Sequence, residues 1–179
     1  RMELSWATIR NAATFFHPYT SERTIISQGE LLTSAIFTLY MIESGSEAVY
    51  LTAPDFMVTD ADKKVDTQLL REKLTALIAD KSKFYITQGF ICTNCKGEID
   101  NLGRGGSDYS AALMGAAINA AEVQIWTDID GMHNNDPRYV DHTFPIRTMS
   151  FSEAAELAYF GAKILHPSTI QPCQDQNIP

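Results

Sequence analysis

The sequence predicts an α/β fold built around a mainly parallel sheet. Short runs rich in β-branched and aromatic residues alternate with apolar stretches at helical spacing, which indicates crossover units between parallel strands. Glycine-rich and acidic segments follow the predicted strands, at the edge where open α/β sheets bind ligands. The chain has 179 residues, of which 45% are hydrophobic and 20% charged, as in ordinary soluble domains.

The first half of the chain predicts two helices and two strands. The apolar residues of "GELLTSAIFTLYMIE" fall on one helical face, which favours a helix over Leu31–Ile42. A short strand is predicted at Ala48–Thr52, followed by a helix over Thr67–Asp80 whose leucines recur at helical spacing. The β-branched and aromatic residues of Lys83–Ile91 then predict a buried strand.

The second half predicts a helix, a strand and a further helix. Small residues from Ser107 to Ala121 favour a helix that Ser107 opens, and Glu122–Asp128 follows as a third strand. Ser150 and Glu153 have the spacing of a capping box, at the start of a helix in "SFSEAAELAYFGAK". Because three strands make a thin parallel sheet and both ends of the chain look cut, we expect a part of a longer protein.

Charge and composition exclude several classes of partner. The formal net charge of -8 argues against nucleic acid or an anionic membrane. The N-terminal segment lacks the basic start and apolar run of a signal peptide. The longest apolar stretch, Ala35–Ile42, is far short of the roughly 20 residues that span a membrane. Three cysteines do not make a disulfide framework, so we expect a cytoplasmic protein.

The segment "LGRGGSDYS", Leu102–Ser110, is too rich in glycine and polar residues to form a core. Its glycines allow the backbone to approach a ligand, and it opens a helix whose free N–H groups favour an anion. Arg104 offers a planar fork for a carboxylate or phosphate, and Asp108 suits a ligand ammonium. The alternative is an ordinary glycine-rich turn in which Ser107 caps the helix.

Other polar clusters are ambiguous when taken singly. In "TDIDG", Asp128 and Asp130 are candidates to hold Mg²⁺ through water, or they begin a turn that Gly131 completes. Lys163 either neutralises phosphate or complements a helix C-terminus. "CTNC", Cys92–Cys95, is half of a structural zinc site without a second pair, and reduced thiols in a surface turn are the alternative.

Several segments that are ambiguous singly indicate one family when they are taken together in their order along the chain. The segments are "SQGELLTSA", "GFI", "LGRGGSDYSAAL", "EVQIWTDIDG", "DPR" and "SFSEAAELAYFGAKILHPSTI", and they extend from Ser27 to Ile170. Together they resemble the central part of the catalytic domain of the aspartokinase family. The resemblance implies the amino-acid kinase fold, a three-layer αβα sandwich, of which residues 1–179 would form a part.

The resemblance also implies an activity. Members of this family transfer the γ-phosphoryl group of MgATP to the β-carboxylate of L-aspartate, giving 4-phospho-L-aspartate. That step opens the pathway to lysine, threonine and methionine. ATP and Mg²⁺ are then the expected cofactors, L-aspartate is the expected substrate, and the parent protein is expected to be a homo-oligomer.

The family's substrate residues carry over onto matching positions of this chain. The resemblance implies that Glu30 meets the substrate ammonium and that Arg104 binds its α-carboxylate. The backbone of Gly105 and Gly106, with the side chains of Ser107 and Asp108, would shape that side of the pocket. For Glu30 there is an alternative, because the Ser-x-x-Glu spacing of "SQGE" is also a capping box.

The nucleotide residues carry over in the same way. Thr127 and Asp128 would contact the nucleotide, while Arg138 of "DPR" and Lys163 would lie near its phosphates. Lys163 and Asp108 are the residues to which the resemblance gives a catalytic role. His166 is interpreted as structural, since it lies in a segment that resembles the end of a family helix.

The chain departs from the family pattern at several places. The usual "TTLGRGGSD" is "DNLGRGGSD" here, so that Asn101 replaces a threonine beside the pocket. Met132 and His133 follow "TDIDG" where many members carry an aromatic residue near the adenine. The family's N-terminal lysine-bearing phosphate segment and its C-terminal ACT regulatory domains have no counterpart here. We therefore expect residues 1–179 alone to be incomplete as a catalyst.

Two alternatives to an aspartokinase remain open. One is another amino-acid kinase, acting on glutamate, N-acetylglutamate, carbamate or a nucleotide, although Glu30 together with the full "LGRGGSD" loop favours aspartate. The other is a non-catalytic fragment that binds aspartate or nucleotide without turnover.

Overall fold

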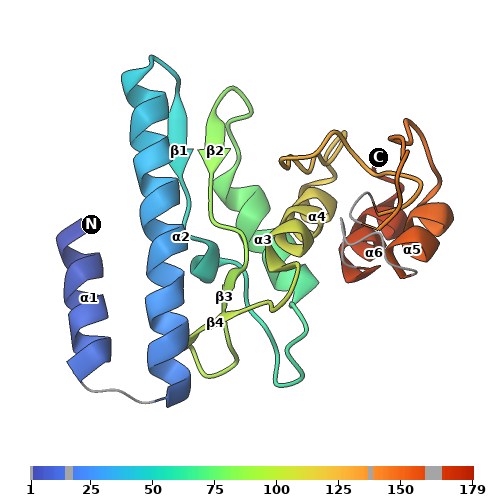
Figure 1. The fold of residues 1–179 in the computed structure, drawn as a ribbon. Coiled ribbons are helices and arrows are strands. Elements are labelled where there is room, and N and C mark those ends of the chain that lie inside the picture. The colour runs from blue at the N-terminus through green and yellow to red at the C-terminus, as the bar shows by residue number, and fades with distance from the viewer. Residues whose placement is uncertain (1, 15–17, 137–138, 160–166) are drawn as a thin grey trace. The chain divides into compact units, whose positions relative to one another are not determined.

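The computed structural model describes residues 2–14, 18–136, 139–159 and 167–179 (Figure 1). The chain forms two compact units, residues 1–107 and residues 108–179. Both units combine helices with buried apolar residues, and the strands lie in the first. The α/β class predicted from the sequence is confirmed.

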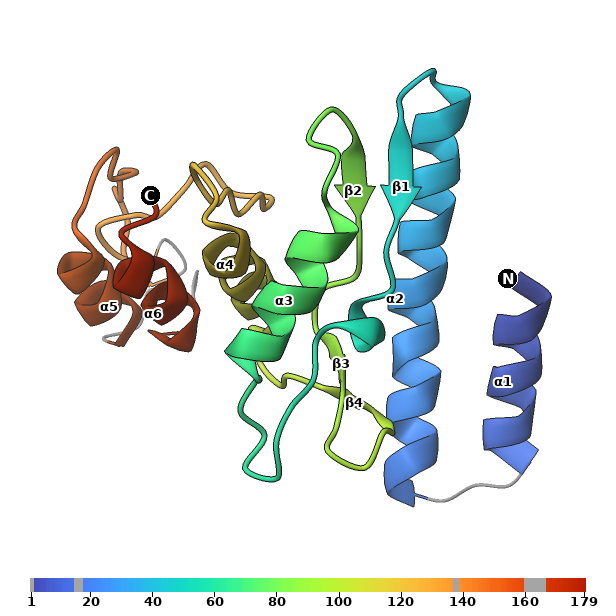
Figure 2. The ribbon, with the colours of Figure 1, turned by 180° about the vertical axis from the view of Figure 1, so that it is seen from behind.

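The first unit contains a parallel pair of strands and an antiparallel hairpin. Its elements are α1 (Met2–Thr14), α2 (Pro18–Glu43), β1 (Ala48–Tyr50), the short 3-10 helix η1 (Ala53–Asp55), α3 (Thr67–Leu77), β2 (Phe84–Ile86), β3 (Ile91–Thr93) and β4 (Ile99–Asn101). β1 and β2 run parallel with α3 between them in the chain, as the crossover pattern predicts. α2 packs against β1 and β4, and α1 packs against α2 (Figures 1 and 2).

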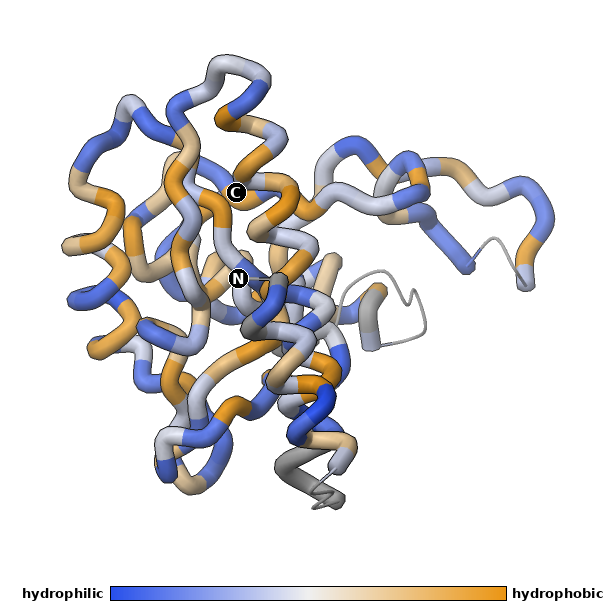
Figure 3. Tube along the Cα trace, turned by 90° about the vertical axis from the view of Figure 1, so that its left-hand side faces the viewer, coloured by the Kyte–Doolittle hydropathy of each residue, from blue (hydrophilic) through white to orange (hydrophobic). Residues whose placement is uncertain are grey.

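Local signals in the sequence explain α3 and the core beneath it. The side chain of Asp66 caps α3 by accepting a hydrogen bond from the Leu69 backbone N–H at 2.9 Å. Leu70 and Leu74, one turn apart, are buried. The most deeply buried large side chains of this unit also include Phe56, Met57, Ile91 and Cys92. Figure 3 shows hydrophobic and hydrophilic residues alternating along the helices, as expected for amphipathic segments.

The predicted strand over Lys83–Ile91 is wrong in its extent. β2 ends at Ile86, and Ile91 begins β3 in a different sheet. Between them Phe90 has a φ of 68°, in the left-handed region. A residue in that region turns the chain sharply, and an extended strand cannot pass through it.

α2 is longer than the predicted helix and begins at Pro18, since proline suits the first turn of a helix. Its predicted apolar face is only partly covered within the unit, because Ile36, Leu39 and Ile42 are exposed. Among the described helices, the Glu22–Glu43 part of α2 is long and apolar enough to cross a membrane by length and composition, and 17% of that window is buried. The apolar stretch is thus longer than the sequence predicted, although the core helix of a soluble protein has the same length and composition.

The second unit contains α4 (Gly106–Ile118), whose first two residues belong to the first unit, α5 (Phe151–Tyr159) and α6 (Pro167–Gln176). Its core is formed by Ala112, Cys173 and Ile178, against which Ala116, Val123 and Phe151 pack. Gly115 permits the close approach of Val123, because a Cβ at position 115 would lie 2.3 Å from a Val123 methyl carbon.

The predicted capping box at the start of α5 is confirmed. The Ser150 backbone N–H donates to a Glu153 carboxylate oxygen at 2.7 Å, and the Glu153 N–H donates to Ser150 Oγ at 3.2 Å. The Ser150 hydroxyl also donates to the same carboxylate oxygen, at 2.8 Å, and the two hydrogen bonds that this carboxylate accepts from the N–H and hydroxyl of Ser150 lower the pKa of Glu153.

The predicted strand over Glu122–Asp128 is absent from the described structure. The Val123 N–H donates to the Pro179 carbonyl at 2.8 Å, but the segment forms no ladder with another described strand. A strand requires a neighbouring backbone for its N–H and C=O groups. Without that neighbour the aromatic ring of Trp126 is exposed.

Candidate functional site

The glycine-rich loop after β4 adopts a left-handed backbone conformation at two of its glycines. Gly103 and Gly105 have φ values of 76° and 71°, which a side chain would make costly. The Gly106 N–H donates to the Gly103 carbonyl at 3.0 Å and closes a turn around Arg104, whose side chain is exposed. The loop is therefore a tight turn that presents an arginine to solvent.

The segment Gly89–Phe90 packs against this loop. A Cβ at Gly106 would lie 2.9 Å from the Phe90 ring, and a Cβ at Gly89 would lie 3.0 Å from the Ser107 Cα. The Leu102 N–H donates to the Phe90 carbonyl at 2.8 Å. Sequence reasoning gave neither residue a role, although "GFI" was one of the segments that carry the family resemblance.

α4 begins at Gly106, so the expectation that Ser107 caps it is wrong. Ser107 lies inside the first turn and is exposed. Asp108, half-buried, is in the same turn, where a carboxylate interacts favourably with the positive end of the helix dipole. Asp108 is the first residue of the second unit.

Glu30 lies in the middle of α2, which rules out the capping-box interpretation of "SQGE". Ser27 is fully buried, and its hydroxyl donates to the Thr24 carbonyl of the same helix at 2.7 Å. Glu30 is half-buried, and its backbone carbonyl accepts a hydrogen bond from Ser34 Oγ at 2.6 Å. None of the described residues forms a hydrogen bond or ion pair with the Glu30 carboxylate, which leaves it available for another role.

A buried amide connects α2 to the carboxyl end of the parallel strands. Gln88 Nε2 donates to Ser34 Oγ at 2.7 Å and to the Leu51 carbonyl at 3.2 Å. Its Oε1 accepts from the Ala53 N–H at 2.9 Å. Nothing in the sequence analysis identified Gln88, because these bonds join segments far apart in the chain.

A second connection joins α2 to β4. The Arg23 guanidinium forms an ion pair with the buried Asp100 carboxylate at 2.5 Å. Asp100 lies opposite Cys92 in the hairpin, and burial, with a smaller contribution from the Asp100 charge, raises the pKa of the Cys92 thiol to about 12. Since metals bind the thiolate, Cys92 is a poor ligand, and Cys95 is exposed on the hairpin turn. The alternative of thiols in a surface turn therefore holds only for Cys95, since Cys92 is buried in the β3–β4 hairpin.

In the second unit, "TDIDG" forms an exposed turn. Thr127 Oγ1 donates to Asp128 Oδ1 at 3.0 Å, and both side chains are exposed. Asp130 Oδ1 lies 2.6 Å from His133 Nε2, and this hydrogen bond lowers the pKa of the Asp130 carboxyl. Gly131 has a φ of 125°, consistent with a turn. Asp128 has an exposed carboxylate, of which Oδ1 accepts from Thr127, and carboxylate oxygens of this kind suit Mg²⁺, whereas Asp130 is engaged by His133.

The structure thus assigns the predicted residues to two groups. Glu30, Arg104, Gly105, Gly106 and Ser107 belong to the first unit, while Asp108, Thr127 and Asp128 belong to the second. Arg138, Lys163 and His166 lie outside the described residues.

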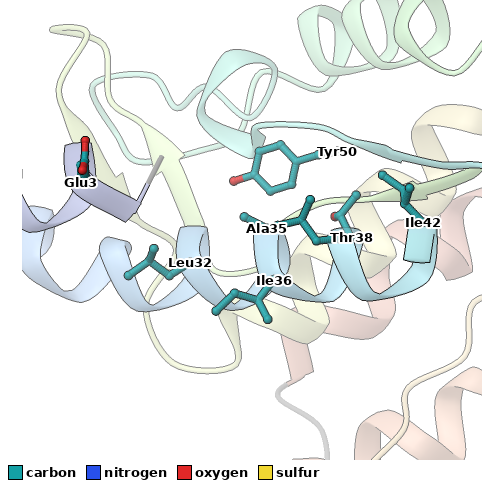
Figure 4. Close-up of a pocket in the computed structure, with 8 residues that line it drawn as sticks. Glu3, Leu32, Ala35, Ile36, Thr38, Ile42 and Tyr50 are labelled. Atoms are coloured by element: carbon teal, nitrogen blue, oxygen red, sulfur yellow. The ribbon is translucent and has the colours of Figure 1, made fainter. Parts of the chain in front are cut away.

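Two cavities lie away from all of these residues. One, of about 640 Å³, is lined by Glu3, Tyr50 and an apolar stretch of α2 that includes Leu32, Ala35, Ile36 and Ile42 (Figure 4). The other, of about 570 Å³, lies in the second unit between α5, α6 and the segment 147–151. No described residue that the sequence analysis assigned to a site lines either of them.

Comparisons with known proteins bear on both units. Residues 4–179 match the amino acid kinase family. The chain is 39% identical to lysine-sensitive aspartokinase 3 of Escherichia coli over 160 residues, which cover 87% of this chain and 36% of that protein. It is 31% identical to aspartokinase 1 of Bacillus subtilis, of which it covers 39%.

A solved structure gives the same result for the fold. E. coli aspartokinase III in complex with aspartate and ADP matches with a TM-score of 0.88 at 36% identity, over 99% of this chain and 41% of that one. The chain thus spans less than half the length of these relatives. With a family match over nearly its whole length and the fold of an aspartokinase, the chain belongs to the amino acid kinase family.

Proposed function

We propose that the protein containing this chain is an aspartate kinase, which transfers the γ-phosphoryl group of MgATP to the β-carboxylate of L-aspartate. The observation that carries the proposal is the tight glycine turn that presents Arg104. The same unit contains Glu30, which is half-buried and does not act as a capping residue. The relative that was solved with aspartate and ADP supports the choice of substrate and nucleotide.

The substrate side of the reaction rests on charge complementarity. Arg104 binds the α-carboxylate through two parallel N–H···O bonds, and the backbone of Gly105 and Gly106 shapes the same side of the pocket. Ser107 adds a hydroxyl donor, and Glu30 binds the α-ammonium. These contacts leave the β-carboxylate of aspartate free to react.

The nucleotide side involves the second unit. Thr127 and Asp128 contact the nucleotide, and Arg138 and Lys163 neutralise its phosphates. Asp128 is the residue that would help to hold Mg²⁺, which supplies charge neutralisation on the phosphate oxygens. Lys163 and Asp108 are the proposed catalytic residues.

The chemistry needs no nucleophile from the protein. A β-carboxylate oxygen of aspartate forms the new bond to the γ-phosphorus while the bond from that phosphorus to the bridging oxygen breaks, which releases ADP. The transition state of such transfers is loose, so positioning and charge neutralisation provide most of the rate enhancement. The product, 4-phospho-L-aspartate, serves the biosynthesis of lysine, threonine and methionine, and the protein acts as a homo-oligomer.

The proposal is tested by measuring ADP formation by the natural full-length polypeptide that contains this chain, with L-aspartate, L-glutamate and N-acetyl-L-glutamate. We expect turnover with L-aspartate alone. Turnover with glutamate or N-acetylglutamate and none with aspartate would assign the protein to another kinase of the family. Binding of aspartate by calorimetry without any turnover would instead favour the non-catalytic alternative.

A further inference from the structure

Asp100 and Asn101 directly precede the glycine turn, and the structure shows what both side chains do. Asp100 is 5% exposed and forms its ion pair with Arg23 of α2. It also accepts a hydrogen bond from the Asn101 N–H at 2.7 Å. Asn101 Oδ1 accepts from the Gly103 N–H at 3.1 Å, one residue before Arg104. The side chains of Asp100 and Asn101 therefore fix the start of the glycine turn.

The other end of the ion pair is on the helix that carries Glu30. Arg23 and Glu30 are seven residues apart in α2, two turns along the same face. With a rise of about 1.5 Å per residue, their backbones are about 10 Å apart along the helix axis. Arg104 follows Asp100 by four residues. The Arg23–Asp100 pair thus joins the two elements that carry Glu30 and Arg104.

The charges around Asp100 make Arg23 its essential partner. Cys92, directly opposite in the hairpin, is neutral because its pKa is raised, so it brings no competing charge. The charge of Lys63 acts on Cys92 more weakly than that of Arg23, and Lys63 forms no ion pair with a described residue. Among the described residues, Arg23 is the cation that pairs with Asp100. A buried carboxylate that loses such a partner is strongly destabilised, so the link resists separation of the two elements.

We propose that Arg23 and Asp100 are positioning residues that set the separation between Glu30 and Arg104 and thereby the affinity for the amino-acid end of the substrate. The α-ammonium and α-carboxylate of an amino acid are attached to one carbon, so groups that bind both must be held at a fixed separation. Neither Arg23 nor Asp100 touches the substrate. This inference rests on the proposed function of Glu30 and Arg104.

The kinetic test compares Arg23→Gln, Asp100→Asn and the double variant in the full-length polypeptide. We expect each to raise KM for aspartate about tenfold, with kcat and KM for ATP changed less than about twofold, because only substrate positioning is lost. The double variant should be no worse than either single one, since both changes remove the same interaction. Arg23→Lys should recover most of the affinity, and Arg71→Gln, which changes an exposed arginine of α3, should have no effect.

A second readout does not depend on activity. Trypsin cleaves after arginine, and the rate of cleavage between Arg104 and Gly105, followed by mass spectrometry, reports how firmly the turn is held. Arg23→Gln and the double variant should accelerate this cleavage about tenfold, while cleavage after the exposed Lys73 in α3 stays unchanged.

The outcomes separate the two proposals. Unchanged KM for aspartate together with unchanged cleavage after Arg104 would overturn the positioning role. Equal acceleration at Lys73 and Arg104 would also overturn it, since the pair would then stabilise the whole unit without a specific effect on the turn. If the unaltered protein does not phosphorylate aspartate, the proposed function fails, and the cleavage rates still decide whether Arg23 and Asp100 hold the turn.

Discussion

Gln88 and Ser34 are linked by a partly buried hydrogen bond of 2.7 Å, from the Gln88 amide to the Ser34 hydroxyl. Ser34 extends this chain of hydrogen bonds, because its own hydroxyl donates to the Glu30 backbone carbonyl at 2.6 Å. A side chain at the end of the parallel strands is therefore connected, through one hydroxyl, to the backbone of the proposed substrate-binding glutamate.

Replacement of Gln88 by alanine should destabilise the protein by about 2–4 kcal/mol. The change leaves the Ala53 N–H and the Leu51 carbonyl buried without a partner and opens a cavity. Urea unfolding of the two proteins measures the difference. Gln68→Ala, at an exposed position of α3, is the matched control and should change stability by less than about 0.5 kcal/mol. A Gln88→Ala protein as stable as the control would contradict the importance of this network.

Replacement of two helical glycines by alanine should change the stability of the protein in opposite directions. Gly115→Ala should destabilise by about 1–3 kcal/mol, because the new Cβ would lie 2.3 Å from a Val123 methyl carbon. Gly29→Ala, in α2, meets nothing within 4 Å and should stabilise by up to about 1 kcal/mol through helix propensity. Thermal unfolding measures both, and Val123→Ala should relieve part of the Gly115→Ala defect. A Gly115→Ala protein that is no less stable than the unaltered one would show that packing at Gly115 is looser than described, and a destabilising Gly29→Ala would show that position 29 is not open space.

Arg104→Ala should raise KM for aspartate by about 100-fold and leave KM for ATP within about twofold. The charged, bidentate contact to the α-carboxylate is lost, which is worth about 3 kcal/mol, while the nucleotide contacts are untouched. Arg104→Lys should recover part of the effect, since it keeps the charge without the planar fork. Initial rates at varied aspartate and varied ATP make the measurement. Equal increases in both KM values would count against the assigned role.

The cysteines should differ in reactivity and in their effect on alkaline stability. Cys95 is exposed and should react with a disulfide reagent at pH 8, whereas the buried Cys92 and Cys173 should react only after unfolding.

Because the folded pKa of Cys92 is raised to about 12 from 9.0, the unfolded thiol ionises first as pH rises. Its contribution to stability is therefore complete below pH 9 and is lost between about pH 9 and 12.

Unfolding of the unaltered protein and of Cys92→Val, compared from pH 7 to 11, tests whether Cys92 makes the protein less stable as the pH rises. The free energy of unfolding of the unaltered protein should fall relative to that of the variant above about pH 9. Parallel curves would mean that Cys92 ionises equally easily in both states. Rapid modification of Cys92 in the folded protein would lead to the same conclusion.

Features that depend on neighbouring residues in the chain were predictable from the sequence. The capping box of Ser150 and Glu153 and the left-handed glycines of the turn around Arg104 follow from local chemistry. The parallel pairing of β1 and β2 followed from the alternation of strand and helix. The same local reasoning was wrong for "SQGE", because the helix starts further upstream, at Pro18, a signal that was present but not used.

Features that depend on distant partners were not predictable in this way. The segment 122–128 has a strand-like sequence, but pattern alone does not say whether a neighbouring backbone is there to pair with it. No residue pattern predicts a phenylalanine at positive φ, so the interruption of the strand at Phe90 was not predictable from the sequence. The Gln88 network and the Arg23–Asp100 ion pair join positions far apart in sequence, which only the folded chain brings together.

The position of Glu30 between two cross-links of α2 has a thermodynamic consequence. Arg23 ties the helix to β4 on one side of Glu30, and Ser34 ties it to Gln88 on the other. A helix fixed at two points flanking one residue leaves little freedom to that residue's backbone. The entropy lost in ordering Glu30 is thus incurred once, when the chain folds, and a ligand that binds there meets a group already in place.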